Sequence, residues 1–248
     1  MRYFVRFAYN GTDFHGSQTQ PNGVTVQETL ENAFSTILRV PVPLTFAGRT
    51  DAGVHAEYMI AHFDFADSLP DNLVGRLNNL LPASIAVGDI RPVPDDSHAR
   101  FDAVERTYYY RITTRKDPFC CLFRTRVERI LDFTAMNQAA KHLLGRQDFA
   151  SFCRVHTDVK TTFCDVKEAR WVVENDHEAY FVITADRFLR NMVRAVVGTL
   201  FDVGRGRMTE QQFVDIVAAK NRCSAGHSAP PEGLSLVNIK YPKTIYHD

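Results

Sequence analysis

The sequence predicts an α+β protein made of two units that each combine strands with helices. Segments that alternate between apolar and polar residues, as strands do, are interspersed along the chain with segments of helical periodicity. The second half repeats the mixture of predicted strands and helices found in the first, and no long Gly/Ser-rich or Pro-rich linker separates the two halves. We therefore expect units at residues 1–105 and 106–248, packed side by side or sharing a sheet.

The first half supplies strands and two helices. Residues 2–9 alternate between two faces, which predicts a half-buried strand. Thr25 and Glu28 have the spacing of a capping box, and apolar residues then recur at helical spacing as far as Leu38. Further predicted elements are strands at 43–47, 58–65 and 85–93, with a short helix at 72–80.

The second half begins with a predicted strand at 108–113. A helix follows from an N-cap at Asp132 to Leu144, where Gly145 closes it. The remaining predicted elements are a hairpin of strands 166–174 and 180–185, a helix at about 188–203, a helix capped by Thr209 and Gln212, and a last strand at 234–241.

Composition excludes several classes of protein. The chain has 248 residues and 45% apolar residues, which is enough for a sizeable core. Arg2 and Arg6 interrupt the opening stretch, so a secretory signal is not expected. The longest uncharged apolar stretch, around residues 80–88, is far shorter than the roughly 20 residues that a membrane helix needs. We expect a cytoplasmic protein without a membrane span.

The five cysteines are expected to be reduced and mostly structural. They form no Cys-x-x-Cys pair, and their odd number does not suit a complete disulfide framework. A zinc site built from Cys153, Cys164 and a histidine is the alternative, although this spacing fits no familiar ligand pattern.

Charge is segregated along the chain although the net charge is zero. Residues 57–72 contain four acidic residues and no Lys or Arg, whereas residues 100–129 contain eight basic residues and four acidic ones. Such segregation can direct a positive face toward a polyanion even in a neutral protein. An ordinary solvated surface is the alternative interpretation.

Residues 47–55 are the segment with the strongest candidates for catalytic residues. Gly48 and Gly53 flank an Arg-x-Asp core after a predicted strand, and they allow sharp turns that would present Arg49 and Asp51. A carboxylate in that place can act as a nucleophile or general base, and a nearby guanidinium would keep it ionised and oriented. The alternative is an Asx-turn with a surface ion pair.

Residues 48–55, Gly-Arg-Thr-Asp-Ala-Gly-Val-His, resemble the signature of the TruA family of tRNA pseudouridine synthases. Ser17 departs from the family, which commonly has Trp there, and this puts local packing or an RNA contact in doubt. The resemblance continues, in the order of the family, at residues 10–16, 26–28, 101–103 with 106–110, 144–152, 188–198 and 229–234.

The resemblance implies a fold, a reaction and partners. The fold would be two ferredoxin-like (RRM-like) units with mainly antiparallel sheets and an active cleft between them. The reaction would isomerise uridine to pseudouridine at positions 38 to 40 in the anticodon stem-loop of tRNA, and the protein would be a homodimer. This rearrangement needs no redox change and no group donor, so we expect no cofactor and no metal. No dinucleotide, P-loop or metal motif is found in the sequence.

The resemblance also assigns roles to residues. Asp51 would be the nucleophile, Arg194 would pair with it, and Tyr108 would be the active-site tyrosine. Arg49 belongs to the same motif as Asp51, and we count it in the catalytic set. Whether the first attack falls on C6 of the uracil or on C1′ of the ribose stays open.

Two groups of neighbouring residues are candidates for RNA binding. Tyr108 and Tyr110 alternate with Tyr109 on a strand and would share one face, where aromatic rings can stack on unpaired bases. A core tyrosine is the alternative for Tyr110. Arg187, Arg190 and Arg194 have helical spacing that places them on one face, and we expect Arg190 to face RNA phosphate, with a solvated surface as the alternative. His55 is expected to brace the loop instead of transferring protons.

Two other functions compete with this interpretation. A strand-end Asp in a Gly-rich turn also serves aspartate-nucleophile hydrolases, but these would need metal ligands or a second Asp element. An RNA-binding module without catalysis would keep the aromatic residues and arginines and would have no need of Asp51.

Overall fold

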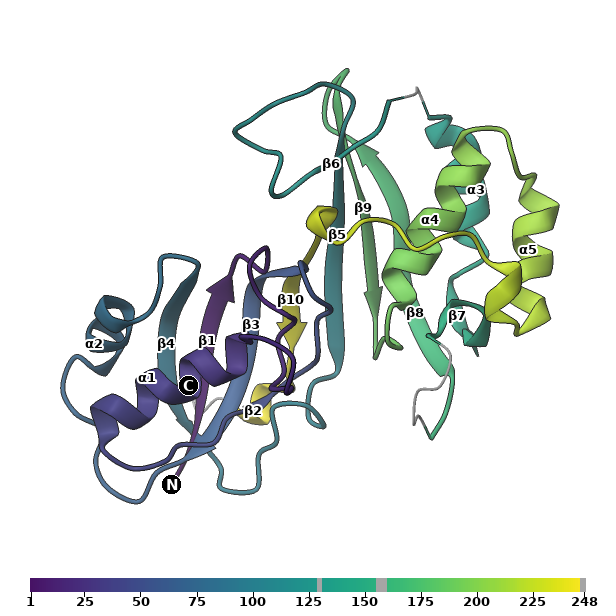
Figure 1. Ribbon diagram of the computed structural model, residues 1–248. Helices are drawn as coiled ribbons and strands as arrows, with labels where there is room; N and C mark the ends of the chain where they lie inside the picture. Colours follow the sequence, from purple (N-terminus) through teal and green to yellow (C-terminus); the bar gives the residue numbers. More distant parts are fainter. Residues whose placement is uncertain (129–130, 155–159, 246–248) are drawn as a thin grey trace. The chain divides into compact units, whose positions relative to one another are not determined.

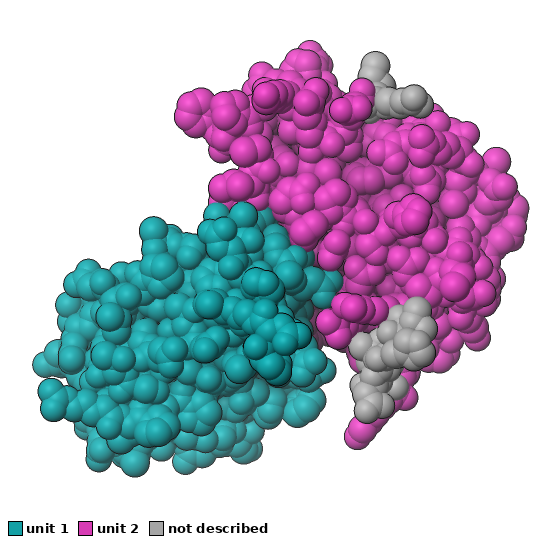
Figure 2. Space-filling model, in the orientation of Figure 1, with its two compact units in different colours: residues 1–104, 236–248 teal, residues 105–235 magenta. Residues whose placement is uncertain are grey.

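The computed structural model describes residues 1–128, 131–154 and 160–245, and it shows a mixed α/β protein. This part of the chain contains ten strands and five α-helices (Figure 1). The chain divides into two compact units, one formed by residues 1–104 and 236–248 and the other by residues 105–235 (Figure 2).

Unit 1 is built on an antiparallel arrangement around its first strand. β1 lies between β3 and β4 and is antiparallel to both, in the register Val5 to Ala61 and Val5 to Ile90. The strand order is β4 (Ile85–Val93), β1 (Arg2–Tyr9), β3 (His55–Asp64) and β10 (Leu234–Lys240), and the short β2 (Thr45–Phe46) pairs with β3.

One face of this sheet carries two helices that pack beside each other, α1 (Val26–Leu38) and α2 (Leu73–Leu80). Phe34 of α1 lies 5.0 Å, centroid to centroid, from Phe63 of β3, which stacks in turn on Tyr3 of β1 at 5.4 Å. These rings are buried and form the core of the unit. Because side chains alternate along a strand, the neighbours of Tyr3 in β1 point to the opposite face.

Unit 2 repeats the combination of antiparallel strands and helices. Its core centres on Trp171, whose ring lies 5.4 Å from Phe181 and 5.9 Å from Phe201. The strand order is β5 (Glu105–Thr113), β9 (Glu178–Ala185), β8 (Phe163–Val173) and β7 (Gly145–Asp148), with β6 (Thr125–Arg126) parallel to β5. The helices are α3 (Phe133–Lys141), α4 (Met192–Gly204) and α5 (Glu210–Ala219).

The predicted helix at 188–203 is wrong at its beginning. α4 starts at Met192, because Asn191 adopts a left-handed conformation with φ 65° that interrupts helical geometry. The predicted helix from Asp132 also ends early, at Lys141, and Gly145 starts β7 at φ 85° instead of closing the helix. The predicted strand at 43–47 contracts to the two residues of β2.

The last strand lies with the first unit. Residues 236–240 of β10 neighbour β3, and Tyr241 donates a hydrogen bond from its hydroxyl to the carbonyl of Ala99 at 2.5 Å. Its ring is 5.2 Å from that of Phe4. The sequence predicted that these residues belong to a second unit over 106–248, whereas the structure groups 236–248 with unit 1. Pairing between segments so distant in the chain leaves no local sequence pattern from which it could be predicted.

Candidate active site

The loop that carries Asp51 is fixed at the residue before it. The N–H of Thr50 donates to Oγ of Ser17 at 2.8 Å, and the carbonyl of Thr50 accepts the N–H of Ser17 at 3.2 Å. The hydroxyl of Thr50 is 2.8 Å from that of Tyr9 at the end of β1. All three residues are buried, so the loop is attached to the unit 1 core by bonds shielded from water.

The other end of the loop is held where β3 begins. Nδ1 of His55 accepts the N–H of Gly11 at 3.0 Å, and His55 is buried. A side chain at Gly11 would overlap the carbonyl of Val54, so only glycine permits this approach. The N–H of Val54 donates to the carbonyl of Asp51 at 3.1 Å, across a turn in which Gly53 has φ 76°. The predicted bracing by His55 and the turn at Gly53 are confirmed.

Asp51 lies between these two attachments and is half-buried, and Arg49, just before the first of them, is exposed. The backbone at Gly48 faces open space, since a Cβ built there has no neighbour within 4 Å. A cavity of about 240 Å³ opens at this point, and Gly48, Arg49, Arg100 and Phe101 contribute to its lining. Because Gly48 and Arg49 line this cavity, the loop that carries Asp51 borders a space open to a bound group.

In unit 2, the two tyrosines proposed for the RNA site have different surroundings. The side chain of Tyr110 is fully buried, and its hydroxyl lies 2.7 Å from Oγ1 of Thr125 and donates to the carbonyl of Pro230 at 2.9 Å. Burial raises the pKa of Tyr110 well above its ordinary value. Tyr110 is therefore a core residue here. Tyr108 is also buried, with 8% of its surface exposed, and its ring meets that of Phe188 edge-on at 5.1 Å.

Arg194 is oriented by the segment that follows α5. It lies in the first turn of α4, and its Nε donates to the carbonyl of Ala229 at 2.7 Å while the N–H of Ala229 donates back to the carbonyl of Arg194 at 2.9 Å. The side chain is half-buried. This pairing fixes where the guanidinium emerges from the helix.

The shared helical face predicted for Arg187, Arg190 and Arg194 is wrong. Arg187 and Arg190 precede α4, so only Arg194 is part of the helix. Arg190 is exposed, and its carbonyl accepts the N–H of Arg154 at 3.1 Å. Since Asp51 belongs to unit 1 and Arg194 to unit 2, the pairing that the resemblance implies for them stays a prediction.

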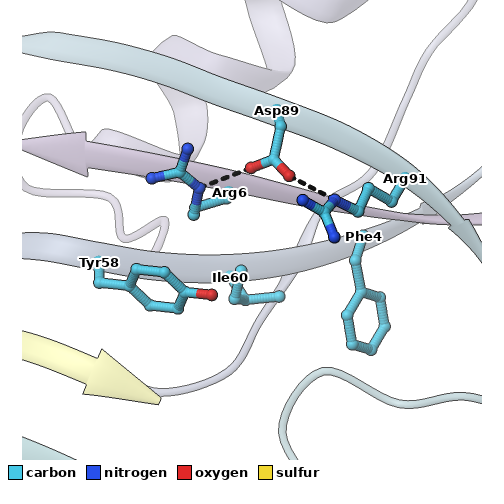
Figure 3. A pocket seen from close by; sticks show the side chains of 6 residues that line it. All are labelled: Phe4, Arg6, Tyr58, Ile60, Asp89 and Arg91. Carbon is cyan, nitrogen blue, oxygen red and sulfur yellow. Dashed lines mark hydrogen bonds and ion pairs between the residues drawn. The ribbon is translucent and has the colours of Figure 1, made fainter. Parts of the chain in front are cut away.

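A second cavity of about 190 Å³ lies in unit 1 among β1, β3 and β4 (Figure 3). Two guanidiniums share one carboxylate there, because Nε of Arg6 is 2.6 Å and Nε of Arg91 is 2.7 Å from the oxygens of Asp89. The ring of Tyr58 lies beside Arg6, 5.7 Å from Cζ to the centroid. Burial raises the pKa of Tyr58. In this cluster both oxygens of the Asp89 carboxylate are already paired with guanidiniums.

The described part of the chain contains neither a cluster of metal-ligating side chains nor a membrane-spanning helix. Across 1–128, 131–154 and 160–245, His, Cys, Asp and Glu side chains nowhere gather in a group of three or more that could hold a metal ion. The five cysteines are free, with Cys153 and Cys164 buried. No helix in this part of the chain combines the length and the apolar character needed to cross a membrane.

Sequence reasoning missed two features of the site in unit 1. Ser17 stood out only as a departure from the family, yet its side chain binds the loop that carries Asp51. Phe101 was noted only as part of a matching block, yet its side chain is 74% exposed at the cavity. The sequence feature that could have pointed to Phe101 is its neighbour Arg100, because an arginine next to an aromatic residue combines a cation with a stacking ring.

Comparisons with known proteins point to one family. The model of a family described as tRNA pseudouridine synthase matches residues 6–102 and 139–242. A protein of Parabacteroides distasonis named tRNA pseudouridine synthase A is 52% identical over 247 residues, which are 99% of this chain and 98% of that protein. Proteins of the same name from Bacteroides fragilis and Porphyromonas gingivalis are 51% and 50% identical, over 99% of this chain and 98% and 99% of their own lengths.

Proposed function

The chain belongs to the tRNA pseudouridine synthase family and is an isomerase, and we propose that it converts uridine to pseudouridine at positions 38 to 40 in the anticodon stem-loop of tRNA. The observation that carries the proposal is the loop of Asp51. Asp51 is half-buried and follows Thr50, which buried hydrogen bonds attach to the core, and Gly48 and Arg49 of the same loop line a cavity.

The proposed nucleophile is Asp51. In the reaction, the bond between N1 of uracil and C1′ of ribose breaks, the base turns, and a bond forms between C5 and C1′. The proton lost from C5 is balanced by the one gained at N1, and the carboxylate is released at the end. Asp51 attacks either C6 or C1′ first, and both routes restore the enzyme without any external reactant.

The other residues support this carboxylate and hold the RNA. We assign Arg49 and Arg194 to keeping the carboxylate ionised and to balancing charge as the base is detached. Tyr108 stacks on the uracil and assists removal of the C5 proton, and Arg190 binds phosphate. Tyr110 supports the strand of Tyr108 from the core, because its hydroxyl is already bonded to Thr125 and Pro230.

The proposal includes the fold of the units, the assembly and the location. The antiparallel order β4-β1-β3 with α1 and α2 supports a ferredoxin-like assignment for unit 1, and we propose the same fold for unit 2. We propose a homodimer that works in the cytoplasm, where its tRNA substrate is found. The reaction rearranges one nucleotide, so the proposed enzyme uses neither a metal nor an organic cofactor.

Replacement of Asp51 tests the function. Asp51→Ala and Asp51→Asn should reduce release of tritium from C5-labelled uridine in tRNA by on the order of 10⁴-fold or more, because a covalent step loses its nucleophile. Binding of tRNA, measured by filter retention, should stay within a few-fold of the parent. Asp71→Asn, which changes an exposed carboxylate before α2, is the matched control and should retain full activity.

Three outcomes decide between the functions. An Ala variant that releases label at a tenth of the parent rate would exclude Asp51 as the nucleophile. Binding of tRNA by the parent without any label release would identify an RNA-binding module. Base-resolution mapping of pseudouridine on the treated tRNA should show product at positions 38 to 40, and strand or base cleavage in its place would support the hydrolase alternative.

A further inference from the structure

Phe101 presents an aromatic ring to solvent at the cavity beside the Asp51 loop. The side chain is 74% exposed, and it lines the cavity of about 240 Å³ to which Gly48 and Arg49 also contribute. Arg49 is two residues before Asp51 in the chain. The ring therefore borders the same opening as the loop of the proposed nucleophile.

The segment that carries this ring is held in place by its own hydrogen bonds. Nδ1 of His98 accepts the N–H of Arg100 at 3.1 Å and that of Phe101 at 3.4 Å. The N–H of His98 donates to the carboxylate of Asp102 at 2.6 Å. The backbone on both sides of Phe101 is thus tied to the same tight turn.

A second histidine attaches the turn to the sheet. Nδ1 of His62, in β3, accepts the N–H of Ala99 at 3.1 Å, and His62 is buried. The rings of His62 and His98 lie 4.6 Å apart, and the ring of Phe101 lies 4.2 Å from that of His98. An apolar ring fixed in a solvent-exposed position has already lost the conformational entropy that binding would otherwise cost.

Most of the remaining lining residues are polar or basic, and Leu44 and Phe46 are the apolar ones. Arg100 places its Cζ 5.8 Å from the centroid of Phe101, and Arg49, Gln18 and Gln27 also line the cavity. No acidic residue is among the lining residues in the described part of the chain. Guanidiniums bind phosphate, amides bind base edges, and aromatic faces stack on unpaired bases.

We propose that Phe101 is the stacking platform for an unpaired nucleotide that neighbours the target uridine, with its phosphate bound by Arg100. This inference rests on the proposed function and adds a specificity-determining residue to it. The basic lining favours RNA over a second copy of the chain, because a symmetric contact would bring the same arginines of both copies together.

The first test compares variants of Phe101 on an anticodon stem-loop RNA with one target uridine. Phe101→Ala and Phe101→Leu should weaken RNA binding by roughly 5- to 100-fold, the usual effect of losing one base-stacking ring. Phe101→Trp should restore it. Phe119→Ala is the matched control, because Phe119 is 96% exposed in unit 2 and should be replaceable without effect.

The second test identifies the nucleotide by pairing the protein variant with abasic RNA. Each nucleotide next to the target is replaced in turn by an abasic residue, and binding of the parent and of Phe101→Ala is measured for each RNA. The penalty of Phe101→Ala should disappear for one abasic position and persist for the others, since that base is then already missing.

Three results would overturn the inference. They are an unchanged Phe101→Ala variant, a penalty that persists for every abasic RNA, and a variant that changes the sedimentation of the free protein, which would assign Phe101 to a protein contact. A parent chain that binds the RNA without forming pseudouridine would instead contradict the proposed function. The abasic comparison, which measures binding alone, would still decide the stacking.

Discussion

Oγ of Ser17 accepts the backbone N–H of Thr50 at 2.8 Å, one residue before Asp51. Both side chains are buried, so water cannot replace this acceptor. The bond joins the segment before α1 to the loop that carries the proposed nucleophile. Position 17 therefore acts on Asp51 through the backbone of Thr50.

We predict that Ser17→Ala lowers both stability and turnover. The buried N–H of Thr50 would lose its acceptor, which costs about 1–3 kcal/mol, and the melting temperature should fall by about 2–4 °C for each kcal/mol. Release of tritium should fall while tRNA binding stays within a few-fold. Differential scanning calorimetry and the label-release assay measure the two effects.

A matched control distinguishes the effect of Ser17 on the Asp51 loop from a general loss of stability. Ser151 is a buried serine of unit 2 whose Oγ donates to the carbonyl of Ile216 and accepts the N–H of Asn221 at 3.0 Å. Ser151→Ala should cost similar stability and leave turnover at temperatures below melting unchanged. Equal losses of turnover in both variants would mean that Ser17 acts through stability alone.

We predict that Tyr108→Phe reduces turnover by about 10²-fold and changes tRNA binding by less than about 3-fold. The ring would still stack, whereas the hydroxyl proposed to assist proton removal would be lost. Tyr109→Phe is the control, because Tyr109 points to the other face of β5 and stacks on Tyr180 at 4.7 Å. Single-turnover rates decide the matter, and an unaltered rate for Tyr108→Phe would remove any role for the hydroxyl.

The two histidines behind Phe101 should make the protein less stable in acid. Burial, with help from Arg2 and His98, lowers the pKa of His62 to about 4, while Asp64 and Asp102 oppose the shift; the pKa of His98 is also lowered, chiefly by burial. In the unfolded chain a histidine has a pKa near 6.5. Between these two pKa values the unfolded state therefore binds more protons than the folded state. The free energy of unfolding decreases as the pH is lowered through that window.

The measurement is the melting temperature between pH 7.5 and pH 4.5. His62→Asn should flatten the pH dependence, because an amide oxygen can accept the N–H of Ala99 and does not titrate. His142→Asn, which changes a half-exposed histidine paired with Glu210, is the control. A slope that His62→Asn leaves unchanged would show that other groups cause the acid sensitivity.

We predict that tRNA affinity falls steeply with salt although the net charge is zero. Each phosphate contact contributes a slope of about 0.7 to 0.9 in the logarithmic plot of affinity against salt. Arg100→Gln should reduce the slope by the amount of about one phosphate contact. Arg76→Gln, which changes an exposed residue of α2, should leave the slope unchanged. Fluorescence anisotropy from 50 to 300 mM salt measures it, and a flat curve for the parent would contradict the prediction.

Local pattern predicted the elements whose signals are local. The alternation of residues 2–9 and 85–93 gave β1 and β4 with the observed bounds, and the Thr25 N-cap does accept the N–H of Glu28, at 3.3 Å. The start of α4 was not predictable from apolar spacing, because the left-handed Asn191 interrupts the backbone without interrupting the pattern. β7 was missed because Gly-Arg-Gln-Asp has no apolar alternation.

The site was predictable only in part, for a similar reason. The motif around Asp51 and the bracing by His55 were readable from short segments and a family resemblance. The bonds of Thr50 to Tyr9 and Ser17 join residues 41 and 33 positions apart, and nothing in either segment specifies the other. The burial of Tyr110 was likewise decided by Thr125 and Pro230, which its own strand does not reveal.

The place of β10 has a consequence for how the protein emerges from the ribosome. Unit 1 consists of residues 1–104 and 236–248, so its sheet gains the strand next to β3 only after the whole of unit 2 has been synthesised. Until then, β3 presents an edge with unpaired backbone groups, which invites pairing with another nascent chain. Pairing between nascent chains through the part of this edge that β2 leaves open is therefore most favoured while residues 105–235 are being translated.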